Sequence, residues 1–243
     1  MKTEMGPYVL RRRLGFGGMS LVFVAYDGTL EREVALKVLN EDYSGDRERV
    51  EQFEREAKLM AAVSHPNVVQ VYTVGQAFGR YYIAMELVSG SSLDALLEEK
   101  GALPEDEVIA IALQTVDGLQ AAASAGLLHR DVKPGNILID EDGIAKISDF
   151  GLSLLTDGGS VRSSEIWATP YYVPPETLLS EEEDHRSDIY ALGASLYHAL
   201  AGKPPIRTKE LKTDILREEK RRVTPLNKLA PWLCEETVEV VRR

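Results

Sequence analysis

The sequence predicts an α+β protein, with a small, sheet-rich N-terminal part followed by a larger, mostly helical C-terminal part. Residues 8–85 contain short runs rich in β-branched and aromatic residues, which are typical of strands, and one long helical stripe. Residues 104–125 and 186–200 instead carry apolar side chains at helical spacing. Strands and helices segregated along a chain are typical of the α+β class. A length of 243 residues suits either one large domain or two lobes.

The composition excludes several classes of protein. Hydrophobic residues make up 44% of the chain, enough for a core, which disfavours intrinsic disorder. The single cysteine, Cys234, excludes an internal disulfide framework and fits a reducing compartment. No apolar run approaches the ~20 residues of a membrane helix, and no signal-peptide pattern is present. We therefore expect a cytoplasmic domain, whose membrane tether, if it has one, would lie outside this segment.

Charge and histidine spacing exclude two further classes. The formal net charge of −11 disfavours a nucleic-acid binder, which needs a concentrated basic face. The four histidines are scattered without the spacing of metal ligands, so a histidine zinc site is not expected.

Five strands are predicted in the N-terminal part. They lie at residues 8–14, 23–26, 33–38, 68–74 and 80–85. Residues 14–22, between the first two strands, read Leu-Gly-Phe-Gly-Gly-Met-Ser-Leu-Val. Such a run is more often a hairpin turn, but glycines also let a backbone aim its amides at phosphate oxygens. Residues 46–62 form the helical stretch, with a stripe of Val50, Phe53, Ala57, Met60 and Ala61.

The chemistry concentrates in residues 129–138, which read His-Arg-Asp-Val-Lys-Pro-Gly-Asn-Ile-Leu, and in Asp149-Phe150-Gly151. A hydroxyl that must lose its proton needs a positioned carboxylate, which Asp131 could supply. A polyphosphate needs cations, which Lys133 and metal ions held by Asn136 and Asp149 could supply.

These motifs, together with Val34-Ala35-Leu36-Lys37, resemble those of eukaryotic-like serine/threonine protein kinases of the type found in many bacteria. The resemblance covers essentially the whole chain. It implies a two-lobed protein-kinase fold with a five-stranded N-terminal lobe and one main helix (1–88), a mostly helical C-terminal lobe (89–243), and ATP between them. Departures are small: Ser20 stands where the family expects glycine, and Gly135 stands where alanine is usual.

The resemblance implies a role for each catalytic residue. Asp131 orients and deprotonates the substrate hydroxyl, and Lys133 neutralises charge on the transferring group. Asn136 and Asp149 hold Mg²⁺, with Mn²⁺ as an alternative. Lys37 binds the ATP phosphates with Glu56 as its partner, although Glu54 is a rival that the helical stripe disfavours only weakly. Thr169 contacts both the catalytic Asp131 and Lys133.

The resemblance also implies the nucleotide-binding set. These residues are Leu14, Gly15, Phe16, Gly17, Gly18, Val22, Ala35, Lys37, Met85, Glu86, Val88, Leu138 and Asp149. The expected partners are ATP and proteins with serine or threonine hydroxyls. Two alternative functions are a pseudokinase that serves as an ATP-binding scaffold and a small-molecule phosphotransferase. The complete set of charged and metal-binding residues disfavours the first, and a peptide-receiving stretch at 168–176 disfavours the second.

The segment between Asp149 and Glu176 is expected to be regulatory, with autophosphorylation at one or more of Ser160, Ser163, Ser164 and Thr169. The three serines are the expected regulatory sites, because Thr169 should not tolerate modification. In relatives the arginine at the position of Arg130 pairs with such a phosphate. We interpret His129 as a packed residue beneath Phe150. A lone Asp188 in a buried helix would be costly unless paired, so we expect it to bond to the catalytic-loop backbone. The acidic run 181–184 is interpreted as a solvated loop.

Three further expectations concern the C-terminal part. The helix 186–200 should be buried on nearly every face, and residues 208–222 should form a charged surface helix. Cys234 should be a packed thiol in a helix spanning 232–243. The chain ends before the stretch that supplies an arginine partner for Glu176 in the family. We therefore expect that the final helices are missing and that the segment before Glu176 is poorly anchored.

Overall fold

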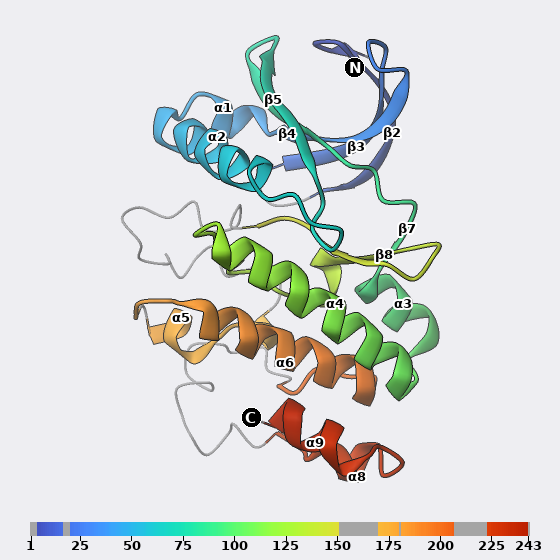
Figure 1. Cartoon of the computed structure of the whole chain (residues 1–243). Helices are drawn as coiled ribbons and strands as arrows, with labels where there is room; N and C mark the ends of the chain where they lie inside the picture. Colours follow the sequence, from blue (N-terminus) through green and yellow to red (C-terminus); the bar gives the residue numbers. More distant parts are fainter. Residues whose placement is uncertain (1–3, 17–19, 151–169, 180, 207–222, 243) are drawn as a thin grey trace. The chain divides into compact units, whose positions relative to one another are not determined.

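The computed structural model describes residues 4–16, 20–150, 170–179, 181–206 and 223–242. The chain divides into two compact units, Met1–Ser89 and Gly90–Arg243 (Figure 1). The expected surface helix at 208–222 lies outside the described residues. Within the described part, no helix is both long enough and apolar enough to cross a membrane.

The N-terminal unit is built on one antiparallel sheet. Its strands are β1 (Glu4–Met5), β2 (Tyr8–Phe16), β3 (Ser20–Asp27), β4 (Arg32–Leu39), β5 (Val71–Ala77) and β6 (Arg80–Met85). They lie in the order β1-β2-β3-β4-β6-β5. All five expected strands are present, and β1 is an additional two-residue strand that pairs with the start of β2.

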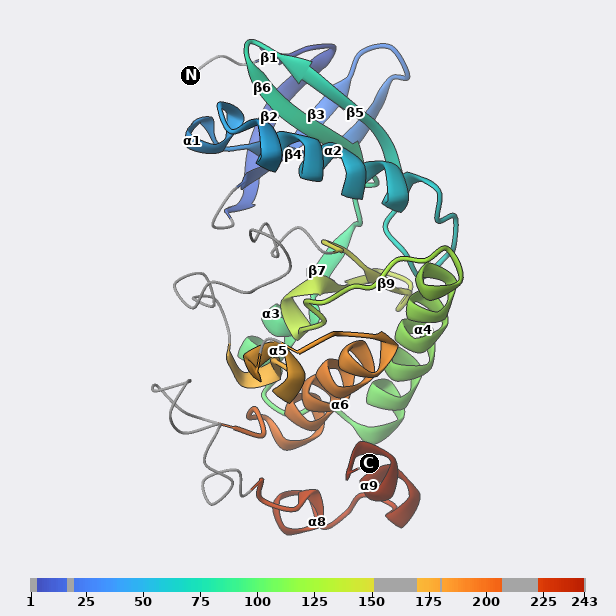
Figure 2. The same cartoon turned by 90° about the vertical axis from the view of Figure 1, so that its left-hand side faces the viewer.

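Two helices follow β4: α1 (Glu41–Ser44) and α2 (Arg47–Ala61). Helix α2 packs on one side of the sheet, against β5 among others (Figures 1 and 2). The predicted stripe is confirmed at Val50, Phe53, Ala57 and Met60, which are all buried. It was wrong at Ala61, which is exposed at the last position of the helix.

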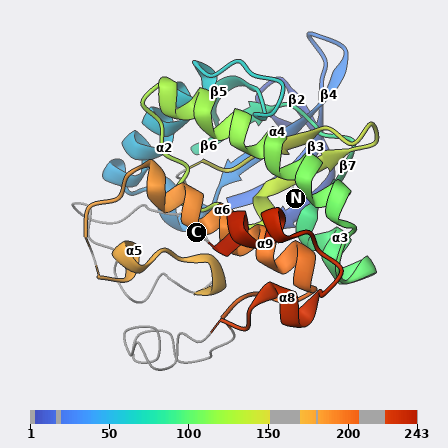
Figure 3. The ribbon, with the colours of Figure 1, turned by 60° about the horizontal axis from the view of Figure 1, so that its bottom comes forward.

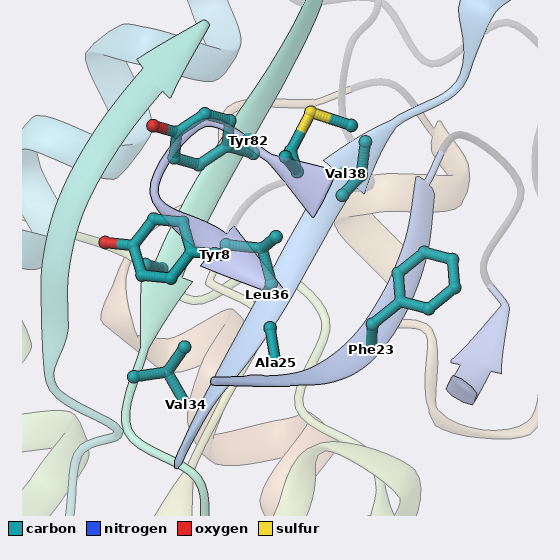
Figure 4. Packing of buried hydrophobic residues seen from close by; sticks show 9 residues of the cluster. Tyr8, Phe23, Ala25, Val34, Leu36, Val38 and Tyr82 are labelled. Atoms are coloured by element: carbon teal, nitrogen blue, oxygen red, sulfur yellow. The ribbon is translucent and has the colours of Figure 1, made fainter. Parts of the chain in front are cut away.

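The other face of the sheet has its own apolar core. Tyr8 and Tyr82 meet there edge to face, with ring centroids 5.5 Å apart, beside Leu36 (Figure 4). A Cβ built on Gly75 would lie 2.4 Å from the Tyr82 hydroxyl, so any other residue at that point of β5 would force the ring to shift. Burying a large apolar side chain contributes roughly 1.5–3 kcal/mol, which makes this cluster a main support of the sheet.

The C-terminal unit combines a small sheet with helices. Its elements are β7 (Gly90–Ser92), α3 (Leu93–Lys100), α4 (Glu105–Ser124), the 3₁₀ turn η1 (Pro134–Asn136), β8 (Ile137–Asp140), β9 (Ala145–Ile147), the 3₁₀ turn η3 (Pro170–Tyr172), α5 (Pro175–Leu179), α6 (His185–Ala201), α8 (Leu226–Leu229) and α9 (Glu235–Arg242). The three strands form an antiparallel sheet in the order β7-β8-β9.

Helix α4 begins after Pro104 and has three acidic residues in its first turn, where the helix dipole favours negative charge. Helical spacing predicts a buried stripe of Val108, Ala112, Val116 and Leu119 along this helix, and that prediction was partly wrong. Val108 and Leu119 are buried, but Val116 is exposed and Ala112 is half-buried. The buried face also includes Ile111, Thr115 and Ala122. Helical spacing alone does not show that these residues are buried and that Val116 is exposed.

Most residues of helix α6 are buried, but not on every face. Asp184 caps its N-terminus by accepting the backbone N–H of Arg186, and Gly202 ends it in the left-handed conformation at φ 67°. Near its start, Ile189 and Tyr190 are 53% and 40% exposed, so the expectation of burial all round was wrong there. Helices α8 and α9 pack against α6 (Figure 3).

The final helix is shorter than expected, and its cysteine is not packed. Trp232 lies before α9 and is 68% exposed. Cys234 is exposed, which corrects the expectation of a packed thiol. Its Sγ lies 3.4 Å from the backbone N of Thr237 and accepts that N–H, so it acts as a cap at the start of α9.

Candidate active site

The loop between α4 and β8 is fixed by a buried histidine. The His129 side chain is fully buried, its Nε2 lies 2.9 Å from the carbonyl oxygen of Ser148, and its ring centroid lies 4.5 Å from that of Phe150. The expected packing against Phe150 is thus confirmed. Burial lowers the pKa of His129, and the nearby Asp188 only partly opposes this effect. The ring is therefore neutral at pH 7 and suited to packing.

A carboxylate from α6 holds the backbone of the same loop. Asp188 Oδ2 accepts the backbone N–H of His129 at 2.8 Å, and Oδ1 accepts that of Arg130 at 2.7 Å. The prediction that Asp188 bonds to the catalytic-loop backbone is confirmed. Arg130 has a φ of +64°, a conformation that L-residues rarely adopt. Two hydrogen bonds to a charged acceptor are the kind of support that keeps such a backbone in place.

Asp131, Lys133 and Asn136 form one hydrogen-bonded cluster. Lys133 Nζ lies 2.6 Å from Asp131 Oδ2, and Asn136 Nδ2 donates to the same oxygen at 3.0 Å and to the Asp131 carbonyl at 2.8 Å. The turn η1 brings them together, because the Asn136 N–H donates to the Lys133 carbonyl. The Asp131 carboxylate is therefore oriented through one of its two oxygens.

Strand pairing places Asp149 next to Asn136. Ile137 and Ile147 are register partners in β8 and β9, so the residues just outside them are neighbours. Ser148 donates its backbone N–H to the Asn136 carbonyl at 2.9 Å, and its hydroxyl lies 3.3 Å from Asp149 Oδ2. Gln114 of α4 supports the hairpin, with its side chain bonded to the Gly143 carbonyl and the Ala145 N–H.

This donor set has the chemistry of a Mg²⁺ site. Asn136 uses its Nδ2 group toward Asp131, which leaves its Oδ1 as the atom able to bind a cation. Asp149 adds a carboxylate. Among the described residues there is no group of three or more His, Cys, Asp or Glu side chains that could hold a metal ion by itself. One or two protein oxygens, completed by waters and substrate phosphates, is the coordination that Mg²⁺ commonly adopts.

In the N-terminal unit, four expected nucleotide-binding residues share one face of the sheet. Lys37 pairs with Val22 across β3 and β4, and Ala35 pairs with Met85 across β4 and β6. Residues 35 and 37 point to the same side because side chains alternate along a strand. Lys37, Ala35 and Met85 are buried and Val22 is half-buried.

The other expected residues of this unit lie at its loops. Leu14 is exposed near the end of β2, and Gly15 and Phe16 pair with Val22 and Leu21. Beyond β6, the Glu86 N–H donates to the Gln70 carbonyl at 2.8 Å, and both Glu86 and Val88 are half-buried. The structure describes neither Gly17 nor Gly18, and the side chain of Glu56, on α2, is also outside what it describes.

In the C-terminal unit, Leu138 lies in β8, half-buried and paired with Ser92 and Lys146. Thr169 and the three candidate phosphorylation sites Ser160, Ser163 and Ser164 lie outside the described residues.

Glu176 has a hydrogen-bond partner among the described residues. Its Oε1 accepts the hydroxyl of Ser187 at 2.6 Å. Nearby, the Tyr172 hydroxyl lies 2.6 Å from His198 Nδ1, and burial strongly raises the pKa of Tyr172. The described end of the peptide-receiving stretch is thus joined to α6 at two points.

Sequence reasoning missed two residues of this site. The Ser148 hydroxyl bonds to both the Asn136 carbonyl and Asp149 Oδ2. The one feature of the sequence that could have indicated this role is its position directly before Asp149. Glu183 belongs to the acidic run that was interpreted as a solvated loop. Its side chain is only 12% exposed and its Oε2 lies 3.3 Å from Arg130 Nε, so that interpretation was wrong for Glu183. Asp184, which caps α6, keeps a side chain that is 43% exposed, in agreement with that interpretation.

Comparisons with known proteins agree on one family. The family model for the protein kinase domain matches residues 8–238. The serine/threonine-protein kinase PknA of Mycobacterium tuberculosis is 37% identical over 244 residues, covering 98% of this chain and 57% of that protein. The serine/threonine-protein kinase PknE of Mycobacterium bovis is 40% identical over 210 residues, covering 86% of this chain and 37% of that protein. This chain therefore spans little more than half the length of the first of these relatives.

A solved structure is similar as well. The crystal structure of the kinase domain of Mycobacterium tuberculosis PknI superimposes with a TM-score of 0.74 at 28% sequence identity, over 98% of this chain and 87% of that one.

Proposed function

The chain belongs to the protein kinase domain family, in its serine/threonine class, and we propose that it transfers the γ-phosphoryl group of ATP to serine and threonine hydroxyls of proteins. The observation that carries the proposal is the cluster of Asp131, Lys133 and Asn136, with Asp149 beside it. This cluster supplies a proton acceptor, a cation and two oxygen ligands within one loop and one hairpin. In this proposal the units Met1–Ser89 and Gly90–Arg243 correspond to the two lobes of the family.

In the proposed mechanism, Asp131 binds the substrate hydroxyl and accepts its proton as the phosphoryl group is transferred. Asn136 and Lys133 hold the carboxylate by Oδ2, so that it meets the hydroxyl in a fixed orientation. The Lys133 ammonium, next to this carboxylate, offsets negative charge on the transferring group. Positioning and charge neutralisation are the main contributions a protein makes to this reaction.

We assign the divalent metal to Asn136 and Asp149 and propose that it is Mg²⁺, with Mn²⁺ as the alternative. The bound metal ion neutralises charge on the ATP phosphates. The residues fit it because one amide oxygen and one carboxylate oxygen are hard ligands carried by adjacent strand ends. Lys37, buried on β4, supplies a further cation for the phosphates, and Glu56 is its proposed partner.

We further propose that the adenine group is bound by the residues of the N-terminal unit that share a face with Lys37. Val22, Ala35 and Met85 offer an apolar surface there. The backbone groups of Glu86 and Val88, at the end of the unit, are the proposed hydrogen-bond partners of adenine. Because ATP is supplied in the cytoplasm, we place the domain there. The proposed protein substrates include the chain itself, at Ser160, Ser163, Ser164 or Thr169.

The test is mass spectrometry of the purified chain after incubation with Mg-ATP and a serine/threonine-rich acceptor protein. Phosphate on either protein, absent from a parallel reaction with Asp131→Asn, supports the proposed function. The pseudokinase scaffold predicts nucleotide binding with no phosphate on either protein. Hydrolysis of ATP without protein phosphorylation would also reject the proposal.

A further inference from the structure

Arg130 lies directly before the proposed catalytic Asp131, and its side chain has a carboxylate partner within the chain. Its Nε lies 3.3 Å from Glu183 Oε2, in the short connection between α5 and α6. The Glu183 side chain is 12% exposed, whereas that of Arg130 is 43% exposed. The buried Thr177 of α5 also donates its hydroxyl to Glu183. The carboxyl group of Glu183 is therefore held in place by two partners and is not a solvated side chain.

The same stretch of chain also holds the backbone of Arg130. Asp188 accepts the Arg130 N–H at 2.7 Å, so residues 183 and 188 hold Arg130 by its side chain and by its backbone. These two contacts matter because the backbone of Arg130 has a positive φ. A residue in a rarely adopted conformation persists only where its surroundings over-determine it. Any relaxation at residue 130 would rotate the peptide that leads into Asp131.

The low exposure of Glu183 strengthens its interaction with Arg130. Ion pairs between two exposed side chains are weakened by solvent and salt, and many contribute little. Here one partner is nearly buried and is oriented by a neutral hydroxyl donor, so screening is weaker. The side chain of Thr177 fixes the carboxylate without competing for it as a second cation would.

We propose that Glu183 is a positioning residue for phosphoryl transfer: its carboxylate holds Arg130 and thereby sets the orientation of Asp131. This inference rests on the proposed function. Glu183 supplies a carboxylate to Arg130 as part of the chain itself, so the loop is held without a phosphate group. A phosphate on the chain that reached Arg130 would have to compete with Glu183 for the guanidinium.

The test compares Glu183→Gln with Glu183→Asp and with Glu182→Gln. The third variant is the matched control, because Glu182 is exposed, adjacent and of the same charge. We expect Glu183→Gln to lower kcat about 10-fold to 100-fold, the scale of a misplaced catalytic group, with the KM for ATP unchanged. Glu183→Asp should restore part of the loss, and Glu182→Gln should behave like the parent chain. Melting temperatures measured alongside give the folded fraction of each variant.

Two outcomes would overturn the proposal. The first is a parental kcat in Glu183→Gln. The second is a loss of activity that follows the folded fraction, or that the aspartate variant does not restore. A double-mutant cycle with Arg130→Met adds a readout that does not need activity, since the two single changes should be non-additive in melting temperature. If the parent chain transfers no phosphate, the proposed function fails, whereas the cycle still reports whether Glu183 and Arg130 are coupled.

Discussion

Asp188 Oδ1 lies 2.7 Å from the backbone N of Arg130, although 58 residues separate the two in the sequence. The second oxygen of Asp188 accepts the neighbouring N–H of His129. One buried carboxylate at the start of α6 thus holds two consecutive backbone N–H groups of the loop that carries Asp131. The same contact therefore stabilises the C-terminal unit and positions the proposed catalytic Asp131.

Asp188→Ala should lower the stability of the C-terminal unit. The substitution leaves two backbone N–H groups without their acceptor, at about 1–3 kcal/mol for each that stays buried. We expect a loss of about 2–5 kcal/mol in the free energy of unfolding, measured by urea titration. Asp188→Asn keeps one acceptor oxygen and should lose less. Equal stability of the alanine variant and the parent would show that the loop is held by other contacts.

Asp131→Asn should retain nucleotide binding but slow phosphotransfer by roughly 10²-fold or more, the scale of a positioned acid–base group. The asparagine keeps the shape of the side chain but cannot accept the hydroxyl proton. Single-turnover transfer and nucleotide titration measure the two effects separately. Asp142→Asn, in the exposed β8–β9 turn, is the control and should change neither. Undiminished transfer in Asp131→Asn would move the role to another carboxylate.

Asp149→Asn should weaken nucleotide binding in the presence of Mg²⁺ and leave binding without metal little changed. The reason is that a hard cation loses a charged oxygen ligand. Titrations with and without Mg²⁺, repeated with Mn²⁺, separate the metal-dependent part and compare the two ions. A variant with the metal dependence of the parent chain would exclude Asp149 as a ligand.

His129 should make stability depend on pH. Burial lowers its pKa in the folded state below the ordinary value of 6.5, which the unfolded chain keeps. As the pH falls through about 6.5, the unfolded state takes up a proton that the folded state excludes. The free energy of unfolding should therefore fall from pH 7 toward pH 5, and the decline should continue until the folded-state pKa is passed.

The measurement is urea unfolding at pH 7 and pH 5. His129→Gln removes the titrating ring, so its stability should fall less between these pH values than that of the parent. His185→Gln is the control, because His185 is exposed at the start of α6. If His129→Gln and the parent lose equal stability on acidification, the buried ring is not the source of the effect.

Gly90→Ala should destabilise the small sheet of the C-terminal unit. A Cβ at residue 90 would lie 1.9 Å from the carbonyl oxygen of Ile139, so the backbone of β7 or β8 must shift. Overpacking of this kind typically costs about 1–3 kcal/mol. Gly135→Ala is the matched control, because a Cβ there meets nothing within 4 Å. A lower melting temperature only in Gly90→Ala is expected, and equal values for the two variants would contradict it.

The sequence by itself determined the α+β class, the five main strands and the motifs that carry the proposed chemistry. It could do so because those features are local. Alternation along β4 and the stripe of Phe53, Ala57 and Met60 follow from side-chain periodicity. The need to pair Asp188 followed from its charge within an apolar helix, and this was enough to predict its contact with the catalytic loop.

Only the tertiary structure decided which side chains of similar chemistry are buried and what they contact. Glu181 and Glu182 are exposed, whereas Glu183 is oriented by Thr177 and Arg130. The run of acidic residues in the sequence does not distinguish them. Val116 and Ile189 are exposed although each is an apolar residue in a helix that buries other apolar side chains. Cys234 caps a helix instead of entering the core. The physical reason is that burial and ion pairing depend on the elements packed opposite, and those elements come from parts of the chain far away in sequence.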